Sequence, residues 1–450
     1  MFLLFSLTFS ASPRLGGSIF IEMATVNLAY GKSEIAFDYD ERQFEILAKE
    51  TNLATLSDVE INAALDSSID SETLETIVEA GDSVLIVVPD ATRKAATGQI
   101  VNLLVRRLIA NGVAPFDIRI VFAVGIHRPV TEEEKRELLT PFIAQRIRTI
   151  EHNSRDLMRL AGLESNQFVD FGTTKRGTPI ELNRALIEHD KIILIGSVNF
   201  HYFAGFGGGR KLICPGLASE NTVNATHKLI FDCQQKTRRA GVGVGLLAGN
   251  PVHEEFLEIV EKINPAFAVN TIVDEAGNAA RVFAGNWKTS HKRACEFYAA
   301  NFSIEIAEKR PLVVVSAGGS PLDLNLIQAH KALEMASHAC AVGGTIVWLA
   351  ECADGLGRND FLDWFAAENS QELAGNLCAK FQVNGQTAWS LMEKAECFKI
   401  YLISDLPAET VKKMRLVPVE NLSDAFSKID GSLNGYILPF GAKFLPTINS

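Results

Sequence analysis

Histidines follow two of the most apolar segments of this 450-residue chain. His201 comes just after residues 191–196, and His127 comes just after residues 117–124. Both segments have the length and the β-branched content of buried strands. Parallel strands deliver the residues after their carboxyl ends to one crevice of an α/β sheet, which is where such sheets bind ligands. Because imidazole titrates near neutral pH, this pair could exchange protons with a bound substrate.

A glycine-rich segment follows His201. Glycine tolerates positive φ, so its backbone N–H groups can approach an anion. Arg210 and Lys211 come next and add positive charge. A plain strand-to-helix turn is the alternative, but these residues together favour a phosphate-bearing cofactor. The segment is not a Walker A loop, because no hydroxyl residue follows the lysine. The glycines are Gly205, Gly207, Gly208 and Gly209.

A third apolar segment, residues 83–88, leads into Asp90 and Arg93 and then into a helical pattern over residues 98–110. At this strand-to-helix turn, Arg93 could hold a carboxylate through two parallel hydrogen bonds. The structural alternative makes Asp90 a helix cap and Arg93 a solvated charge.

Further candidates lie beyond the glycines. His227 fits no zinc-ligand spacing, so spacing alone makes it a surface or packing histidine. Gln328 and Lys331 fall on one face of a helix predicted over residues 324–336, where solvated side chains are the default.

Apolar strands alternate with helical patterns in both halves of the chain. This predicts an α/β fold of two domains, with mainly parallel sheets, flanking helices and a ligand site in the cleft between the domains. We expect a cofactor-binding domain over residues 23–303 and a second domain over residues 304–450, whose last segment can pack back on the first. A β-hairpin is predicted over residues 267–283.

Composition narrows the partners and the compartment. A formal net charge of -11 without a basic stripe favours a small ligand over nucleic acid, and no segment is apolar enough to cross a membrane. The seven scattered cysteines include no C-x-x-C pair, which predicts reduced thiols in the cytoplasm and argues against a disulfide framework. Residues 1–22 are expected to be an over-extended start, with Met23 as the natural one; a signal peptide is the alternative.

The motifs together resemble the nickel-pincer lactate racemase family, over essentially the whole chain after Met23. The resemblance implies a nickel pincer nucleotide, the pyridinium-3-thioamide-5-thiocarboxylic acid mononucleotide, which holds nickel through sulfur, carbon and sulfur. It rests on P-D-A-T-R at 89–93, G-I-H-R-P at 125–129, H-Y-F-A-G-F-G-G-G-R-K-x-I-x-P-G at 201–216 and Q-A-H-K-A-L-E at 328–334.

The resemblance also implies a role for each candidate residue. Lys211 is similar to the lysine that tethers the cofactor covalently, and His227 to the sole protein ligand of the nickel. His127 and His201 are similar to the family's paired acid/base histidines. The remaining positions would bind the substrate carboxylate (Arg93 and Lys331, with Gln328 beside them) or support the site and the nucleotide phosphate (Asp90, Gly207, Gly208 and Gly209).

The implied reaction inverts C2 of a 2-hydroxy acid. One histidine takes the hydroxyl proton while hydride passes from C2 to the pincer carbon, which gives a planar 2-keto acid. Return of the hydride to the other face, with a proton from the second histidine, inverts the centre while the carboxylate stays held. Enzymes that make the cofactor would be needed in trans.

Ile327 departs from the pattern of lactate-specific members, which have tyrosine directly before the glutamine. The substrate could therefore be lactate, another 2-hydroxy acid, or a sugar acid epimerised at C2. Two other function classes stay open from the residues alone. One is a nicotinamide-dependent dehydrogenase, although the G-x-G-x-x-G fingerprint of such enzymes is missing; the other is a non-catalytic nucleotide-binding protein.

Overall fold

The computed structural model describes residues 23–51, 53–156, 160, 165–431 and 433–448. These residues form two compact units, each assembled from more than one stretch of the chain. The predictions for residues 1–22 lie outside the described residues. Within the described ranges, no helix combines the length and the apolar character that a membrane crossing requires.

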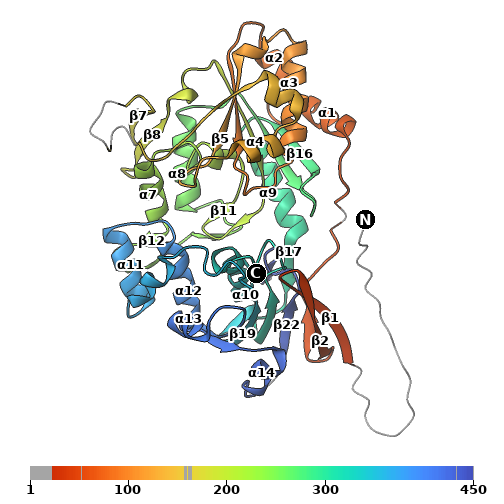
Figure 1. The fold of residues 1–450 in the computed structure, drawn as a ribbon, viewed down its shortest axis with the longest axis vertical. Helices are drawn as coiled ribbons and strands as arrows, with labels where there is room; N and C mark the ends of the chain where they lie inside the picture. Colours follow the sequence, from red (N-terminus) through yellow and green to blue (C-terminus); the bar gives the residue numbers. More distant parts are fainter. Residues whose placement is uncertain (1–22, 52, 157–159, 161–164, 432, 449–450) are drawn as a thin grey trace. The chain divides into compact units, whose positions relative to one another are not determined.

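The larger unit, residues 50–302 and 371–386, is built on a six-stranded sheet of order β16-β15-β9-β4-β5-β6. Figure 1 labels β5 and β16 of this sheet. All neighbours pair in parallel except β15 and β16, which form the predicted antiparallel hairpin. Every residue of β4 is buried, as expected of a central parallel strand that is covered on both faces. The bounds are β4 Val84–Pro89, β5 Ile118–Ala123, β6 Arg148–Ile150, β9 Lys191–Ser197, β15 Phe267–Val273 and β16 Ala279–Gly285.

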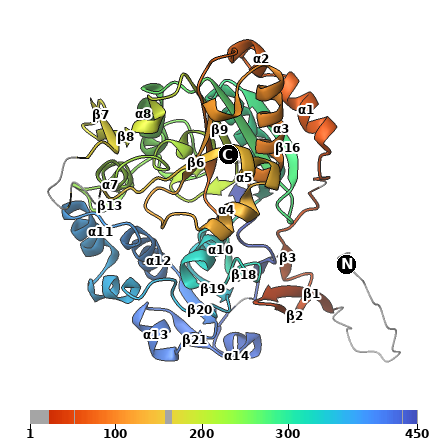
Figure 2. The same cartoon turned by 45° about the horizontal axis from the view of Figure 1, so that its top comes forward.

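One face of this sheet packs against α3 (Thr97–Ala110), which confirms the helix predicted there. Ile100 and Leu104, four residues apart on one side of α3, meet Ile86 and Val88 of β4 in a common apolar core. Two shorter helices, α1 (Asp58–Asp66) and α2 (Leu74–Ile77), lie beside α3 in both views (Figures 1 and 2).

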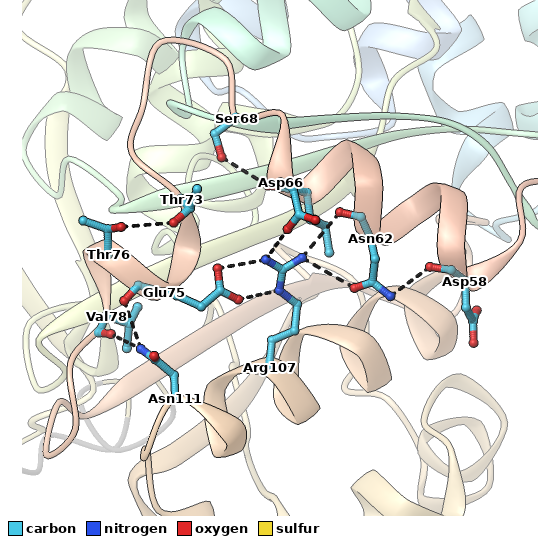
Figure 3. Close-up of polar contacts among 11 residues, drawn as sticks. Asp58, Asn62, Asp66, Ser68, Thr73, Glu75, Thr76, Val78, Arg107 and Asn111 are labelled. Carbon is cyan, nitrogen blue, oxygen red and sulfur yellow. Dashed lines mark hydrogen bonds and ion pairs between the residues drawn. The ribbon is translucent and has the colours of Figure 1, made fainter.

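Arg107 fastens these three helices together (Figure 3). Its guanidinium, on α3, donates two parallel hydrogen bonds to Glu75 of α2, at 2.5 and 2.8 Å, and a third to Asp66 of α1, at 2.6 Å. Asn111 adds a bond from its side-chain amide to the carbonyl of Val78, at 2.7 Å. The bidentate geometry suits the planar guanidinium and fixes the relative orientation of the helices.

Shorter elements form the rest of the larger unit. The segment after β9 forms a small sheet and one turn of 3-10 helix, η3 (Gly209–Leu212), which packs on β4, β9 and β15. The other elements are α4 Glu132–Leu138, α5 Pro141–Arg146, α7 Glu220–Lys228, α8 Pro251–Glu261, α9 Thr289–Phe302, and the strands β7 Phe168–Thr173, β8 Pro179–Asn183, β10 Phe200–His201, β11 Ala204–Phe206, β12 Phe231–Asp232, β13 Thr237–Arg238 and β14 Gly243–Val244.

The smaller unit has a six-stranded sheet of order β21-β20-β19-β18-β22-β3, in which all neighbours pair in parallel. Two parallel-rich sheets with flanking helices confirm the predicted α/β fold. The strands of the unit are β1 Met23–Tyr30, β2 Ser33–Asp40, β3 Phe44–Ile46, β17 Ser303–Ile306, β18 Arg310–Ser316, β19 Cys340–Leu349, β20 Lys399–Ile403, β21 Val417–Val419, β22 Gly435–Leu438 and β23 Leu445–Ile448; the helices that begin or end in it include α10 Leu326–Ala339, α11 Ser370–Ala379, α12 Gly385–Cys397, α13 Ala408–Lys413 and α14 Leu422–Ser427.

The grouping of segments differs from the predicted domain boundaries in two places. Residues 23–49 belong to the smaller unit, because β3 pairs with β22 and the backbone N–H of Leu47 donates to the carbonyl of Ile437. Residues 371–386 belong to the larger unit, where Gln386 donates to the hydroxyl of Tyr202. The prediction that the last segment of the chain packs back on the first domain stays a prediction.

A disulfide joins Cys233 to Cys378 within the larger unit. The two cysteines are 145 residues apart in sequence, which is why spacing did not reveal the pair. The prediction that all seven cysteines are reduced is wrong for these two, and the cytoplasmic prediction loses that part of its support. The free cysteines are Cys214, Cys295, Cys340, Cys352 and Cys397.

We expect the double variant Cys233→Ser/Cys378→Ser to lose stability in the absence of reductant. A link across so long a loop restricts the unfolded chain, and its removal costs about 2–5 kcal/mol. The measurement is urea unfolding with and without reductant. The free energies of unfolding of wild type and variant should become equal when reductant is present. Cys397→Ser, which removes a free cysteine, is the matched control. Equal stability without reductant would contradict the prediction.

Candidate active site

Three adjacent parallel strands, β5, β4 and β9, place the candidate residues at one edge of the larger sheet. Asp90 follows β4, and His127 lies in the turn after β5. The segment with His201 and Lys211 follows β9. A hydrogen bond of 2.8 Å from Gly125 N–H to the carbonyl of Gly216 ties the His127 turn to the end of the glycine-rich segment. The predicted convergence on a carboxyl edge is therefore present in the backbone.

His127 is bonded to Asp90. Its Nδ1 lies 2.6 Å from a carboxylate oxygen of Asp90, and the other oxygen accepts from the Thr92 hydroxyl at 2.6 Å and from its N–H at 3.0 Å. Burial opposes ionisation of Asp90, but the hydrogen bonds from His127 and Thr92 outweigh it, and its pKa lies below the usual value. An ionised Asp90 accepts the Nδ1 proton of neutral His127 and leaves Nε2 with a lone pair, which is the form that acts as a base.

His201 has the opposite arrangement. Its Nδ1 accepts from the N–H of Ala204 at 3.4 Å, in the tight pairing of β10 with β11. A neutral imidazole that accepts at Nδ1 carries its proton on Nε2. When both are neutral, the two candidate histidines are thus held in opposite tautomers.

The ring of Phe203 brings three of the candidates together. The His201 ring packs edge-on against it at 4.3 Å between centroids, and the His227 ring at 5.1 Å. Lys211 places Nζ over the same ring, 5.3 Å from its centroid. Phe203 itself is 3% exposed, and Asn250 holds its carbonyl through a 2.9 Å bond. An imidazole, a second imidazole and an amine thus surround one buried aromatic ring.

His227 is buried on α7 and is held in one orientation. Its Nδ1 lies 2.8 Å from the carbonyl of Val223, one helical turn earlier, so Nδ1–H donates and Nε2 keeps its lone pair. Burial, together with the charge of Lys211, lowers the pKa of His227 to about 3. The imidazole is therefore neutral, as a metal ligand must be. Two further rings, Phe256 and Phe381, pack near it.

The glycines of this segment allow close packing against neighbouring residues. Gly208 and Gly209 take the predicted positive φ, 70° and 50°, whereas Gly207 does not. A Cβ on Gly209 would lie 2.5 Å from the ring of His291, and one on Gly207 would lie 2.4 Å from Asn199 Oδ1. The segment is therefore pressed against its own protein on that side, and larger residues do not fit.

Arg210 is not available to a phosphate, which corrects the expectation drawn from its charge. It is 1% exposed, and its Nη2 donates to the carbonyls of Ala204, at 2.7 Å, and Phe206, at 3.2 Å. Nε2 of His291 lies 3.1 Å from Nη1 of Arg210 and 2.8 Å from the carbonyl oxygen of Gly207. Burial lowers the pKa of Arg210 to about 10, so it stays charged at neutral pH. The guanidinium holds the carbonyls of the segment inward.

The remaining candidates, which are Arg93, Gln328 and Lys331, lie on other elements than the residues around Phe203. Arg93 is exposed in the turn after β4, where its N–H bonds the carbonyl of Asp90 at 3.1 Å. Gln328 and Lys331 belong to the smaller unit, on α10, where Lys331 Nζ donates to Gln328 Oε1 at 2.8 Å. Ile327 precedes them as a partly buried residue of the same helix. That Arg93, Gln328 and Lys331 bind one substrate carboxylate stays a prediction.

Sequence reasoning missed three residues of the group. Phe203 lies within the motif of residues 201–216, but no local pattern indicates a role for its aromatic ring. Asn250 precedes Pro251, an N-cap signature that was visible and that α8 confirms. His291 had no local signal, because it reaches Gly207 from 84 positions away in the sequence.

Fold and site together define an α/β enzyme whose polar groups gather at the carboxyl edge of a parallel sheet. Two family models match the chain: lactate racemase N-terminal domain over residues 30–239, and lactate racemase C-terminal domain over residues 306–435. The chain belongs to the lactate racemase family and is an isomerase of the racemase class, rather than the dehydrogenase or binding protein that the residues alone left open.

Individual relatives agree with this assignment. A lactate racemase from Lactiplantibacillus plantarum is 31% identical over 344 residues, which cover 75% of this chain and 77% of that protein. Another from Thermoanaerobacterium thermosaccharolyticum is 28% identical over 422 residues, 92% of this chain and 96% of that protein. The solved structure of the lactate racemase apoprotein from the latter organism superposes with a TM-score of 0.84 at 26% identity, over 94% of this chain and 100% of that one.

We expect Arg210→Met to destabilise the protein by about 2–4 kcal/mol, because two buried carbonyls lose their donor. Arg239→Met is the matched control: its guanidinium also bonds a backbone carbonyl, that of Phe231 at 2.9 Å, but is only half-buried, so its loss should cost about 1 kcal/mol or less. Urea unfolding followed by circular dichroism measures both. Equal losses would mean that Arg210 does not hold the segment in the way described.

Proposed function

We propose that this chain inverts C2 of lactate or a closely related 2-hydroxy acid by moving the hydroxyl proton between His127 and His201. The observation that carries the proposal is the bond between His127 and Asp90 at the sheet edge to which the segment of His201 also leads: Asp90 accepts the Nδ1 proton and leaves Nε2 of His127 able to accept a proton. Inversion through a keto intermediate needs one proton acceptor and one proton donor, and His201 in its imidazolium form would be the donor. The names of the relatives supply the substrate class.

The residues around Phe203 fit a nickel pincer nucleotide. His227 offers a neutral imidazole whose Nε2 is oriented by the bond from Nδ1 to Val223, which is the second contact that fixes metal-binding histidines. Among the described residues, no group of three or more His, Cys, Asp or Glu side chains could hold a metal ion alone, so a metal here needs ligands from another group. Lys211 Nζ lies over the Phe203 ring against which His227 also packs, so a group tethered to Lys211 could reach that imidazole.

When bound, the cofactor supplies nickel and the carbon that accepts hydride from C2. His127 takes the hydroxyl proton at Nε2, and the ionised Asp90 stabilises the imidazolium that results. His201 would give a proton to the same oxygen from its imidazolium form when the centre closes again from the other face, and would be left as the neutral imidazole that accepts a proton in the reverse direction. From the opposite enantiomer the two histidines exchange roles, so each direction uses both.

The substrate carboxylate needs cations that stay charged. We assign Arg93 and Lys331 to it, with Gln328 positioned by its bond to Lys331. Gly208 and Gly209, in positive φ, are assigned to the nucleotide phosphate through their N–H groups. Ile327 in place of tyrosine makes the pocket wall apolar, which allows a longer 2-hydroxy acid than lactate. Other enzymes would make the cofactor in trans.

Covalent attachment of the cofactor is the first test. Co-expression with the enzymes that make the cofactor should give a protein one adduct heavier than its sequence, with nickel bound. Peptide mapping by mass spectrometry should place the adduct on Lys211, and Lys211→Arg should lack it. His227→Ala should keep the adduct but lose most of the nickel, since only the metal ligand is removed. An unmodified wild-type chain under these conditions would refute the proposal.

The second test concerns the two histidines. We expect His127→Ala and His201→Ala each to lower the rate of interconversion by about 10²–10⁴-fold, the usual contribution of a positioned acid or base. Enantiomers have equal free energies, so the loss in kcat/KM must be the same from D- and L-lactate. Chiral chromatography of the reaction measures it. His189→Ala is the control, because that imidazole bonds the carbonyl of Ala185 instead. Wild-type rates in either variant would exclude the two-histidine scheme.

A further inference from the structure

A buried polar cluster joins α10 to α12 in the smaller unit. His330 and Glu334 of α10 meet Ser390 and Lys394 of α12, and each of the four is 4% exposed or less. The two helices lie side by side in both views (Figures 1 and 2). Residues four apart share one helix face, so each helix turns both of its polar residues toward the other helix.

The hydrogen bonds of the cluster can all be satisfied at once. Lys394 Nζ forms a close ion pair with Glu334 Oε2 and donates to Ser390 Oγ at 2.8 Å. Ser390 Oγ also lies 3.2 Å from Glu334 Oε2 and 3.1 Å from His330 Nε2. A hydroxyl has one proton and two lone pairs. Ser390 therefore donates to Glu334 and accepts from Lys394 and from Nε2–H of His330.

Such a cluster resists displacement of α10. One residue along a helix is a rotation of 100° and a rise of 1.5 Å, so a small slide or turn of α10 would separate Glu334 from Lys394 inside the protein. A buried charge without its partner is strongly unfavourable. The apolar contacts of α10 give weaker control, because four of its nine buried residues are alanines: Ala329, Ala332, Ala336 and Ala339.

The exposed side of α10 carries Gln328 and the partly buried Lys331. His330 directly precedes Lys331, and Glu334 follows it by one turn. We propose that the cluster of His330, Glu334, Ser390 and Lys394 positions α10 so that Lys331 and Gln328 meet the substrate carboxylate. The proposal rests on the function proposed above, since it names what holds the assigned carboxylate-binding residues in place. The four are positioning residues and do not touch the reacting atoms.

The decisive variant replaces the ion pair with apolar side chains of similar volume, Glu334→Met/Lys394→Met. Such replacements usually preserve folding, so the melting temperature should stay within a few degrees of wild type. We expect KM for lactate to rise at least fivefold with kcat within twofold, because the carboxylate contacts are disturbed and the proton-transferring groups are not. In the unloaded protein, hydrogen exchange of the peptide over residues 326–334 should be at least tenfold faster.

The matched control is Glu409→Met/Lys412→Met, an exposed ion pair of α13 in the same unit, which should change neither KM nor exchange. A double variant with wild-type KM and wild-type exchange overturns the inference and leaves the cluster a purely stabilising one. If the double variant does not fold, Ser390→Ala should raise KM and Ser390→Thr, which keeps the hydroxyl, should restore it; equal KM values would overturn the inference. If cofactor-loaded wild-type enzyme interconverts neither lactate nor a longer 2-hydroxy acid, the proposed function fails, and hydrogen exchange alone decides the positioning role.

Discussion

Hydrogen bonding between parallel strands is the constraint on which the site depends. Because β5, β4 and β9 are neighbours that run in one direction, the turns after them must leave the sheet at the same edge. Strand pairing alone therefore places His127, Asp90 and the segment from His201 to Lys211 at that edge, whatever contacts their side chains make. The bond from Gly125 to Gly216 then joins two of these turns directly.

Burial disfavours the charged form of both His227 and Asp90, but only His227 is kept neutral. For His227 it disfavours the imidazolium and, with the nearby lysine, lowers the pKa far enough to keep the ring neutral. For Asp90 it disfavours the carboxylate, but donors from His127 and Thr92 overcome that penalty and lower the pKa. The site thus holds a neutral imidazole and an ionised carboxylate in similarly buried positions, and local hydrogen bonds make the difference.

Two buried cations show why charge in a sequence is a weak guide to a binding role. Arg210 adjoins a glycine-rich segment and looks like a phosphate ligand, yet its guanidinium is used by the carbonyls of Ala204 and Phe206. Lys394 lies in a segment without any recognisable motif, yet it is buried in the smaller unit and paired with Glu334. In both cases the partner comes from the three-dimensional packing, and a residue type alone does not reveal whether a cation faces solvent or protein.

The sequence by itself determined the α/β class, the strands that precede His127 and His201, the hairpin over residues 267–283 and the helix that carries Gln328 and Lys331. These follow from local patterns: apolar runs, helical spacing and glycine positions are read within a few residues. Only the tertiary structure decided the packing of Phe203 between His201, His227 and Lys211, the inward turn of Arg210, the bond between Cys233 and Cys378, and the pairing of β3 with β22. Each of these joins groups through space, and several lie far apart in the chain, so no local pattern encodes them.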